Sequence, residues 1–222
     1  MDKSQLFELY EILALILPGS VMLYGVSKLY PQLMLFPLDS DFSAGQFGVF
    51  VLLAYAVGHI VQVLGGFVEF IWRNLRGDPM DWFQKGKKPL VLDHQIANLE
   101  EKVAKLLGIR DDNFHLNNLT RKEWLNMIKQ MQISVEIAGR TGRLDKFQAI
   151  YMMCRGLIAT LLVLSFASAI TVPLEYWYTP YILLLFAFIL FYRMIRFERN
   201  SVRELFIQFL QLPNPSKETK NG

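Results

Sequence analysis

Small and polar residues recur along one face of an otherwise apolar stretch of the sequence. They follow one another at helical steps of three and four residues, with one histidine beside them. They are Gly58, His59, Gln62, Gly65, Gly66 and Glu69, and we call them the polar seam. Glycines let a neighbouring helix approach closely, and polar side chains inside a membrane are costly and usually face protein or water. The pattern therefore suits helix contact or water passage rather than catalysis.

Two interpretations of the polar seam follow from these properties. In the first, the seam lines a water path or opens one on activation. In the second, the glycines pack, and His59, Gln62 and Glu69 form hydrogen bonds to the other helix of the first hairpin. The two interpretations agree if the seam is closed at rest and pairs again between protomers.

No pattern in the sequence predicts an enzyme, a metal site or a cofactor site. Cys154 is the one cysteine, which excludes an intramolecular disulfide and a cysteine-rich zinc site. The polar stretch Asp111–His115 has no second histidine or cysteine at ligand spacing, and we interpret it as a loop between helices. Motifs for a nucleophilic serine, a phosphate-binding loop and a zinc-binding helix are missing from the sequence.

The elements that must position the seam are predicted to be membrane helices. Of the 222 residues, 53% are hydrophobic and 19% are charged, against about 45–50% and 25% in soluble domains. A helix needs about 20 mostly apolar residues to cross a bilayer. Four stretches suit this role, at residues 6–26, 47–71, 157–172 and 177–195. The alternative keeps only the last two as spans and makes the first two interfacial or re-entrant, because Glu8, Glu11 and Pro18 interrupt the first.

Lysine and arginine are distributed unevenly around these stretches. Residues 73–155 contain 15 of the 23 basic residues and residues 193–222 contain six more, whereas the connection 28–46 contains one and 173–176 none. Basic residues favour the cytoplasmic side of a membrane. We therefore expect both termini and the central region to be cytoplasmic.

The charge of the first residues bears on whether the N-terminal segment is a signal peptide. Met1-Asp2-Lys3 is only weakly basic and no small-x-small cleavage site follows, so we expect the first segment to be retained rather than cleaved as a signal peptide. Glu8 and Glu11 lie near the inner face, where Lys3 or Arg73 is a candidate partner.

The predicted fold is an all-α integral membrane protein. Four transmembrane helices form two hairpins, with a small helical cytoplasmic domain between them. The predicted divisions are a first hairpin over 1–72, the cytoplasmic domain over 73–150, a second hairpin over 151–195 and an amphipathic tail over 196–222.

Helix signals in the central region are local and specific. Apolar spacing predicts a helix over 93–107, stopped by Gly108. Thr120 and Glu123 have the spacing of a capping box, which predicts a second helix that runs to Ala138. From Leu144 we expect one helix to continue into the third span, and we expect residues 73–93 to be irregular.

The tail carries an apolar face, formed by Val202, Leu205, Phe206 and Phe209. Arginines lie among and opposite these residues, which is the pattern of an amphipathic helix on the inner leaflet. A helix packed on the cytoplasmic domain would show the same pattern, and the sequence leaves both possibilities open.

Three patches resemble small bacterial membrane proteins of anti-phage defence, most of all the retron transmembrane effectors. They are LPGSVMLYG at 17–25, GHIVQVLGGFVEFIW at 58–72 followed by Gly77-Asp78-Pro79, and GRLDKFQAIYMMCRGLIAT at 142–160. The resemblance implies a toxin of the bacterial inner membrane, held quiet by a reverse transcriptase and its multicopy single-stranded DNA–RNA. On phage infection such a protein makes the membrane leak, and the cell dies before phage mature. The partners implied are membrane lipid, the retron reverse transcriptase with its DNA–RNA, and further copies of the chain in the active state.

Two other classes of function remain open on the sequence. A channel or transporter subunit would also place polar residues in a span, although no inverted repeat is visible. A membrane scaffold would use the cytoplasmic helices to recruit a partner. None of the three functions requires enzyme activity.

Overall fold

The computed structural model describes residues 3–33, 43–76, 93–109, 114–173 and 176–213. Within these ranges the regular structure is helical throughout, so the prediction of an all-α chain is confirmed. The elements are α1 (Lys3–Leu29), η1 (Pro31–Leu33), α2 (Ala44–Arg76), α4 (Asp93–Leu107), η2 (Leu116–Asn118), α5 (Arg121–Ile137), α6 (Gly142–Thr171) and α7 (Thr179–Leu210).

Four of these helices, α1, α2, α6 and α7, are long and apolar enough to cross a membrane. Much of their apolar surface is not covered by protein, since only 17% of the apolar segment of α2 and 11% of that of α7 is buried. Such apolar exteriors are unstable in water but suit the hydrocarbon of a bilayer. The structure therefore confirms four membrane-length helices.

The described residues pack as two compact units, which we describe separately. Unit 1 contains residues 1–72 and 146–197, and unit 2 contains residues 73–145 and 198–222. Unit 1 thus joins the two predicted hairpins, and unit 2 joins most of the predicted central domain to the predicted tail. Helices α2, α6 and α7 each continue from one unit into the other.

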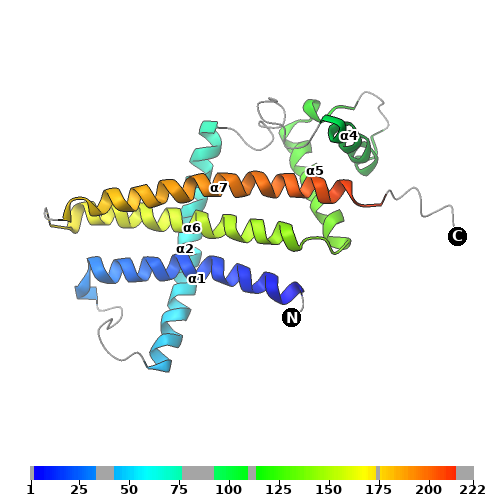
Figure 1. Ribbon diagram of the computed structural model, residues 1–222. Helices are drawn as coiled ribbons and strands as arrows, with labels where there is room; N and C mark the ends of the chain where they lie inside the picture. The colour runs from blue at the N-terminus through cyan, green and yellow to red at the C-terminus, as the bar shows by residue number, and fades with distance from the viewer. Residues whose placement is uncertain (1–2, 34–42, 77–92, 110–113, 174–175, 214–222) are drawn as a thin grey trace. The chain divides into compact units, whose positions relative to one another are not determined.

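Within unit 1, α6 and α7 lie side by side as an antiparallel pair, and α2 crosses α1 and this pair (Figure 1). Residues of α2 contact a different helix at each level. Gly58 packs against α1, Gly65 packs against α6, and the ring of Trp72 lies 4.6 Å from that of Phe191 on α7. Small apolar clusters fill the crossings, including one of Met22, Val61, Ala159 and Leu164.

Unit 2 is built by α4, α5 and the last turns of α7. The predicted capping box of α5 is confirmed, since Thr120 and Glu123 exchange side-chain and backbone hydrogen bonds. Both hydrogen bonds from Thr120 lower the pKa of the Glu123 carboxyl. Gly108 and Gly139 follow α4 and α5 with φ angles of 69° and 66°, a left-handed conformation that glycine adopts at little cost.

Two boundaries differ from the sequence prediction. Helix α2 continues to Arg76, so its last turn replaces the start of the irregular segment predicted over 73–93, most of which lies outside the described residues. Helix α7 runs without a break from Thr179 to Leu210, so residues 196–210 of the predicted tail are the end of a 32-residue helix. No proline or glycine occurs between Pro180 and Leu210 to stop it.

Candidate functional site: the polar seam

The six residues of the polar seam occupy one side of α2 but differ in exposure. Gly58, Gln62 and Gly65 are buried, Gly66 and Glu69 are half-buried, and His59 is exposed. The buried members face α1 and α6, so the seam is a contact surface within unit 1 rather than a lipid-facing stripe.

On the α1 side, the seam brings two helix backbones into contact. A Cβ added at Gly58 would overlap the carbonyl oxygen of Leu15, and one added at Gly19 would overlap that of Ala54. Glycine is thus required on both helices where they cross. This agrees with the packing interpretation of the seam glycines.

Gln62 satisfies a carbonyl that a proline leaves without its helical donor. Pro18 lies inside α1 and has no N–H, so the carbonyl of Ala14, four residues earlier, lacks its usual hydrogen bond. The Gln62 Nε2 group donates to this carbonyl at 3.2 Å, and Thr160 Oγ1 donates to the Pro18 carbonyl at 3.2 Å. Neighbouring helices therefore supply donors where α1 carries its proline, as membrane helices require.

On the α6 side, the seam binds Arg155. Arg155 Nη1 donates to Glu69 Oε2 at 2.8 Å, and its Nε and Nη2 donate to Gln62 Oε1 at 3.2 and 3.1 Å. Gln62 Nε2 completes the link by donating to the carbonyl of Met152 at 2.9 Å. We call Gln62, Glu69 and Arg155 the seam network. It ties α2 to both α1 and α6 through charged and neutral hydrogen bonds.

Glycines on both helices make room for the seam network. A Cβ at Gly156 would lie 2.8 Å from Gln62 Nε2, and a Cβ at Gly65 would lie 2.9 Å from Arg155 Cγ and 3.0 Å from its carbonyl oxygen. At Gly66, in contrast, a Cβ would meet no atom within 4 Å. The two adjacent glycines therefore differ: contact with α6 leaves no room for a side chain at Gly65, whereas Gly66 has open space beside it.

Three sequence expectations about polar partners need separate answers. The packing interpretation of the seam gave His59 a hydrogen bond within the first hairpin; in the structure His59 is exposed, and its ring packs against Tyr55 of its own helix at 4.7 Å. Arg73 was a candidate partner of Glu8 or Glu11, whose side chains lie outside the described residues; it pairs with Glu198 at 3.0 Å. Arg155 was counted only as a basic residue of the inner side, although its place between two apolar runs was a signal for an intramembrane role.

The apolar face of the tail is covered by protein within unit 2. Leu205, Phe206 and Phe209 are buried, and Val202 packs against them. The ring of Phe206 meets that of Trp124 at 6.2 Å, edge to face. Of the two possibilities left open by the sequence, this arrangement is packing on the central helices.

Lys102 holds the end of α7 in this arrangement. Its Nζ donates to the carbonyls of Leu210 and Leu212 at 2.7 and 2.6 Å and to that of Phe209 at 3.4 Å. Carbonyls at a helix C-terminus have no N–H four residues further along the helix, and a cation there is also favoured by the helix dipole. Burial lowers the pKa of the Lys102 ammonium.

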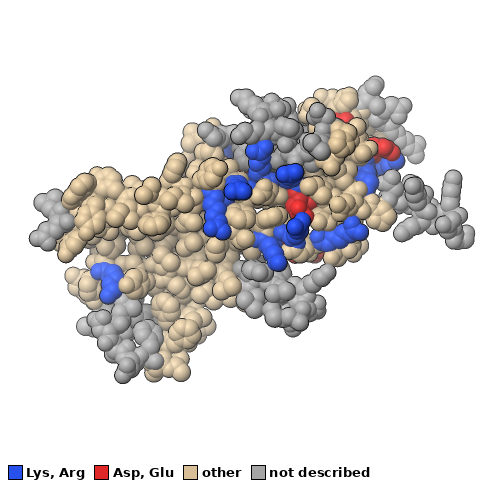
Figure 2. Space-filling model, viewed as in Figure 1, with Lys and Arg blue, Asp and Glu red and all other residues tan. Residues whose placement is uncertain are grey.

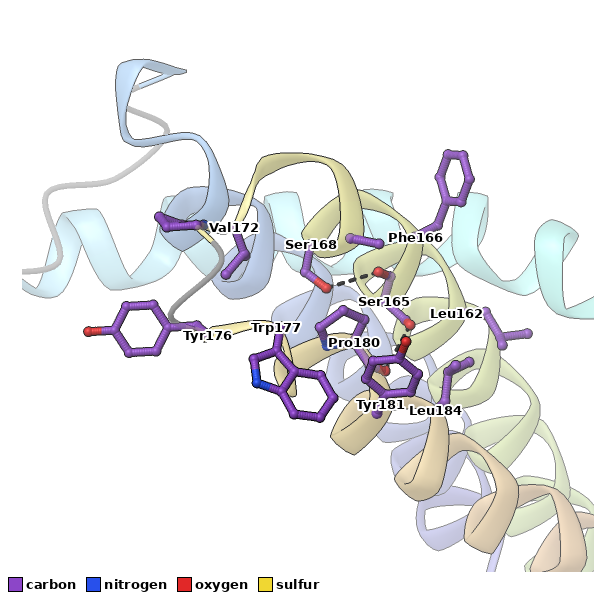
Figure 3. A pocket seen from close by; sticks show the side chains of 12 residues that line it. Leu162, Ser165, Phe166, Ser168, Val172, Tyr176, Trp177, Pro180, Tyr181 and Leu184 are labelled. Atoms are coloured by element: carbon purple, nitrogen blue, oxygen red, sulfur yellow. Dashed lines mark hydrogen bonds between the residues drawn. The ribbon is translucent and has the colours of Figure 1, made fainter.

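A separate cavity of about 520 Å³ lies beside the turn between α6 and α7 (Figure 3). Ser165 and Ser168 lie on its wall, but their hydroxyls donate to the carbonyls of Pro180 and Ser165, at 3.0 and 2.9 Å. Trp177 and Tyr181, 5.8 Å apart, lie on the α7 side. No histidine, lysine or carboxylate occurs among the described residues that line the cavity.

Comparison of the chain with known proteins identifies no relative. No protein-family model, no curated protein and no solved structure matches the chain. Among the described residues, no group of three or more histidine, cysteine or acidic side chains is placed to hold a metal ion. The seam network is thus the candidate functional site of the described residues.

Proposed function

We propose that this chain is a non-enzymatic, membrane-perturbing effector of a bacterial anti-phage system of the retron kind. Released from its inhibitor, it depolarises or permeabilises the inner membrane, and the infected cell dies. The observation that carries the proposal is the seam network, which places an ion pair and an amide between membrane-length helices. The resemblance of three sequence patches supports the anti-phage context.

The physics of the network supports a closed resting state. Arg155 and Glu69 are largely shielded, with 21% and 14% of their side chains exposed. Ionised groups in such surroundings need partners, because loss of one partner leaves a charge without compensation. In the described conformation, Gln62, Glu69 and Arg155 satisfy one another within one chain. Separation of α2 from α6 would require water or a second copy of the chain to replace these bonds.

The distribution of charge supports the proposed orientation. No lysine or arginine occurs from Gly156 to Tyr192, the part of α6 and α7 that flanks their turn. Figure 2 shows lysine and arginine gathered toward the opposite ends of these helices. Under the positive-inside rule, the basic ends and both chain termini are cytoplasmic. The inhibitor, a reverse transcriptase with its DNA–RNA, would then reach the protein from the cytoplasm.

The test compares the parent chain with Glu69→Gln in bacteria, at graded and matched amounts in the membrane fraction. The substitution removes the charge that pairs with Arg155 but keeps the shape of the side chain. We expect Glu69→Gln to collapse the membrane potential at lower protein levels than the parent, read with a potential-sensitive dye. Glu101→Gln, at an exposed carboxylate of α4, is the matched control and should behave like the parent.

A second arm checks that the ion pair itself is responsible. The exchange Glu69→Arg with Arg155→Glu restores opposite charges and should return the dose response toward that of the parent. If neither the parent nor Glu69→Gln alters the potential at any level in the membrane, the effector proposal is wrong. A scaffold would then be the better account.

A further inference from the structure

Helix α5 has a second apolar face that its own unit does not cover. One face, with Trp124, Met127, Met131 and Val135, is buried in the core of unit 2. On the other side, Leu125, Ile133 and Ile137 are 59%, 46% and 82% exposed. Outside α2, these three are the exposed large apolar side chains of unit 2 among the described residues. Their gathering on one helix needs an explanation.

These apolar residues form a continuous ridge with basic ones. Leu125, Lys129, Ile133 and Ile137 follow at steps of four residues, a spacing that places side chains in one row on a helix. Lys122 lies three residues before this row, and the side chains of both lysines are exposed. We call these five residues the α5 ridge. Glu136 is the acidic residue that borders it.

The structure assigns the α5 ridge as a docking surface for the anionic headgroup region of the bilayer that the chain itself crosses. Aliphatic side chains interspersed with cations are the combination that binds a membrane surface, since apolar groups enter the boundary of the acyl chains while cations meet lipid phosphates. The apolar residues of α7 that have the same pattern are covered within unit 2, whereas the α5 ridge is exposed in the part of the chain that the structure describes.

The bilayer is a better occupant than a soluble partner for two reasons. The membrane-length helices keep unit 2 tethered to lipid, so the local concentration of headgroups is high whatever else is bound. The charge on the ridge is also complementary, because two lysines lie among three aliphatic side chains and only one carboxylate borders them. This inference requires only that the chain is inserted in a membrane, and it does not depend on the proposed effector function.

The test places a fluorescent probe on the ridge of the full-length chain. Cys154 is fully buried, so a cysteine introduced at Ile137 can be labelled selectively. The labelled chain is reconstituted in vesicles of phosphatidylcholine, alone or mixed with phosphatidylglycerol. We expect nitroxide-bearing lipid to quench the probe in the anionic vesicles and iodide in water to quench it in the neutral ones. A probe at Asn98, exposed on α4, is the control and should be quenched by iodide in both.

Substitutions identify the contribution of charge. Lys122→Gln and Lys129→Gln should each weaken docking by about fivefold, the effect of one basic residue near an anionic membrane, whereas Lys129→Arg should keep it. Added salt should act in the same direction as the loss of a lysine. If iodide reaches the probe at position 137 equally in neutral and anionic vesicles, the ridge does not dock on lipid. A protein or nucleic-acid partner would then be the occupant to seek.

Discussion

Gly65 and Gly66 are adjacent in sequence but face different surroundings. A methyl group at Gly65 would press on the side chain and carbonyl of Arg155, whereas at Gly66 it would enter open space. Alanine is favoured over glycine in a helix by about 1 kcal/mol in water. Gly66→Ala should therefore keep or raise the thermal stability of the purified protein, and Gly65→Ala should lower it. The melting temperatures in one detergent measure the difference, and equal values would contradict the described α2–α6 contact.

The pairing of Gln62 with Pro18 predicts an energetic coupling between two helices. Gln62→Leu removes the donor to the Ala14 carbonyl, at a cost of about 0.6–2 kcal/mol for a hydrogen bond between membrane helices. Pro18→Ala gives α1 its own N–H for that carbonyl. Gln62→Leu should therefore cost less in the Pro18→Ala background than in the parent.

A double-mutant cycle on unfolding free energies measures this coupling directly. Part of the cost should remain in both backgrounds, because Gln62 also contacts the Met152 carbonyl and Arg155. Val63→Leu is the control, at a position 64% exposed on the same helix. Strict additivity of the two substitutions would mean that Gln62 does not serve the carbonyl freed by Pro18.

At the scale of residues, the sequence predicted the residues of the seam on α2 but not Arg155, their partner on α6. The spacing from Gly58 to Glu69 follows from helix geometry, which acts over a few residues. The choice of Arg155 as partner depends on which two helices meet, and Glu69 and Arg155 are 86 positions apart in sequence. Nothing in the spacing near Glu69 encodes that meeting. The same limit explains His59, whose place beside the seam does not fix its direction.

At the scale of elements, local signals predicted helix ends well. The capping box of Thr120 and Glu123 and the stop at Gly108 act through neighbouring backbone groups, and both predicted helices are found where these signals placed them. The end of α7 was not predictable in the same way. An apolar face of Leu205, Phe206 and Phe209 suits lipid and protein equally, and the decision depends on Trp124 and Lys102, which come from distant helices.

At the scale of the whole molecule, the direction of α2 is the feature that most affects topology. On α2, Gly58 packs against α1 and Gly65 packs against α6. These two positions are seven residues apart, which corresponds to a rise of about 10 Å along the helix. Neighbouring helix axes are roughly 8–10 Å apart. The rise of α2 between these two contacts is therefore about equal to the spacing between neighbouring helices. This means that α2 crosses α1 and α6 at a steep angle rather than running along either. Helices α1 and α6, in contrast, run in the same direction, since Pro18 meets Gly156 and Gly25 meets Leu164.

The ends of α2 are therefore the informative places for topology reporters. If α6 leaves the cytoplasm, the parallel α1 does too, and a reporter fused after Asp41 should be periplasmic. Reporters after Lys88 and Lys217 should be cytoplasmic, because basic residues are concentrated around them. Reporters on opposite sides of the membrane at Asp41 and Lys88 would mean that α2 spans the bilayer, although it lies at a steep angle to α1 and α6. A cytoplasmic signal at both would mean that α2 does not span the membrane, and it would leave α6 and α7 as the spanning pair.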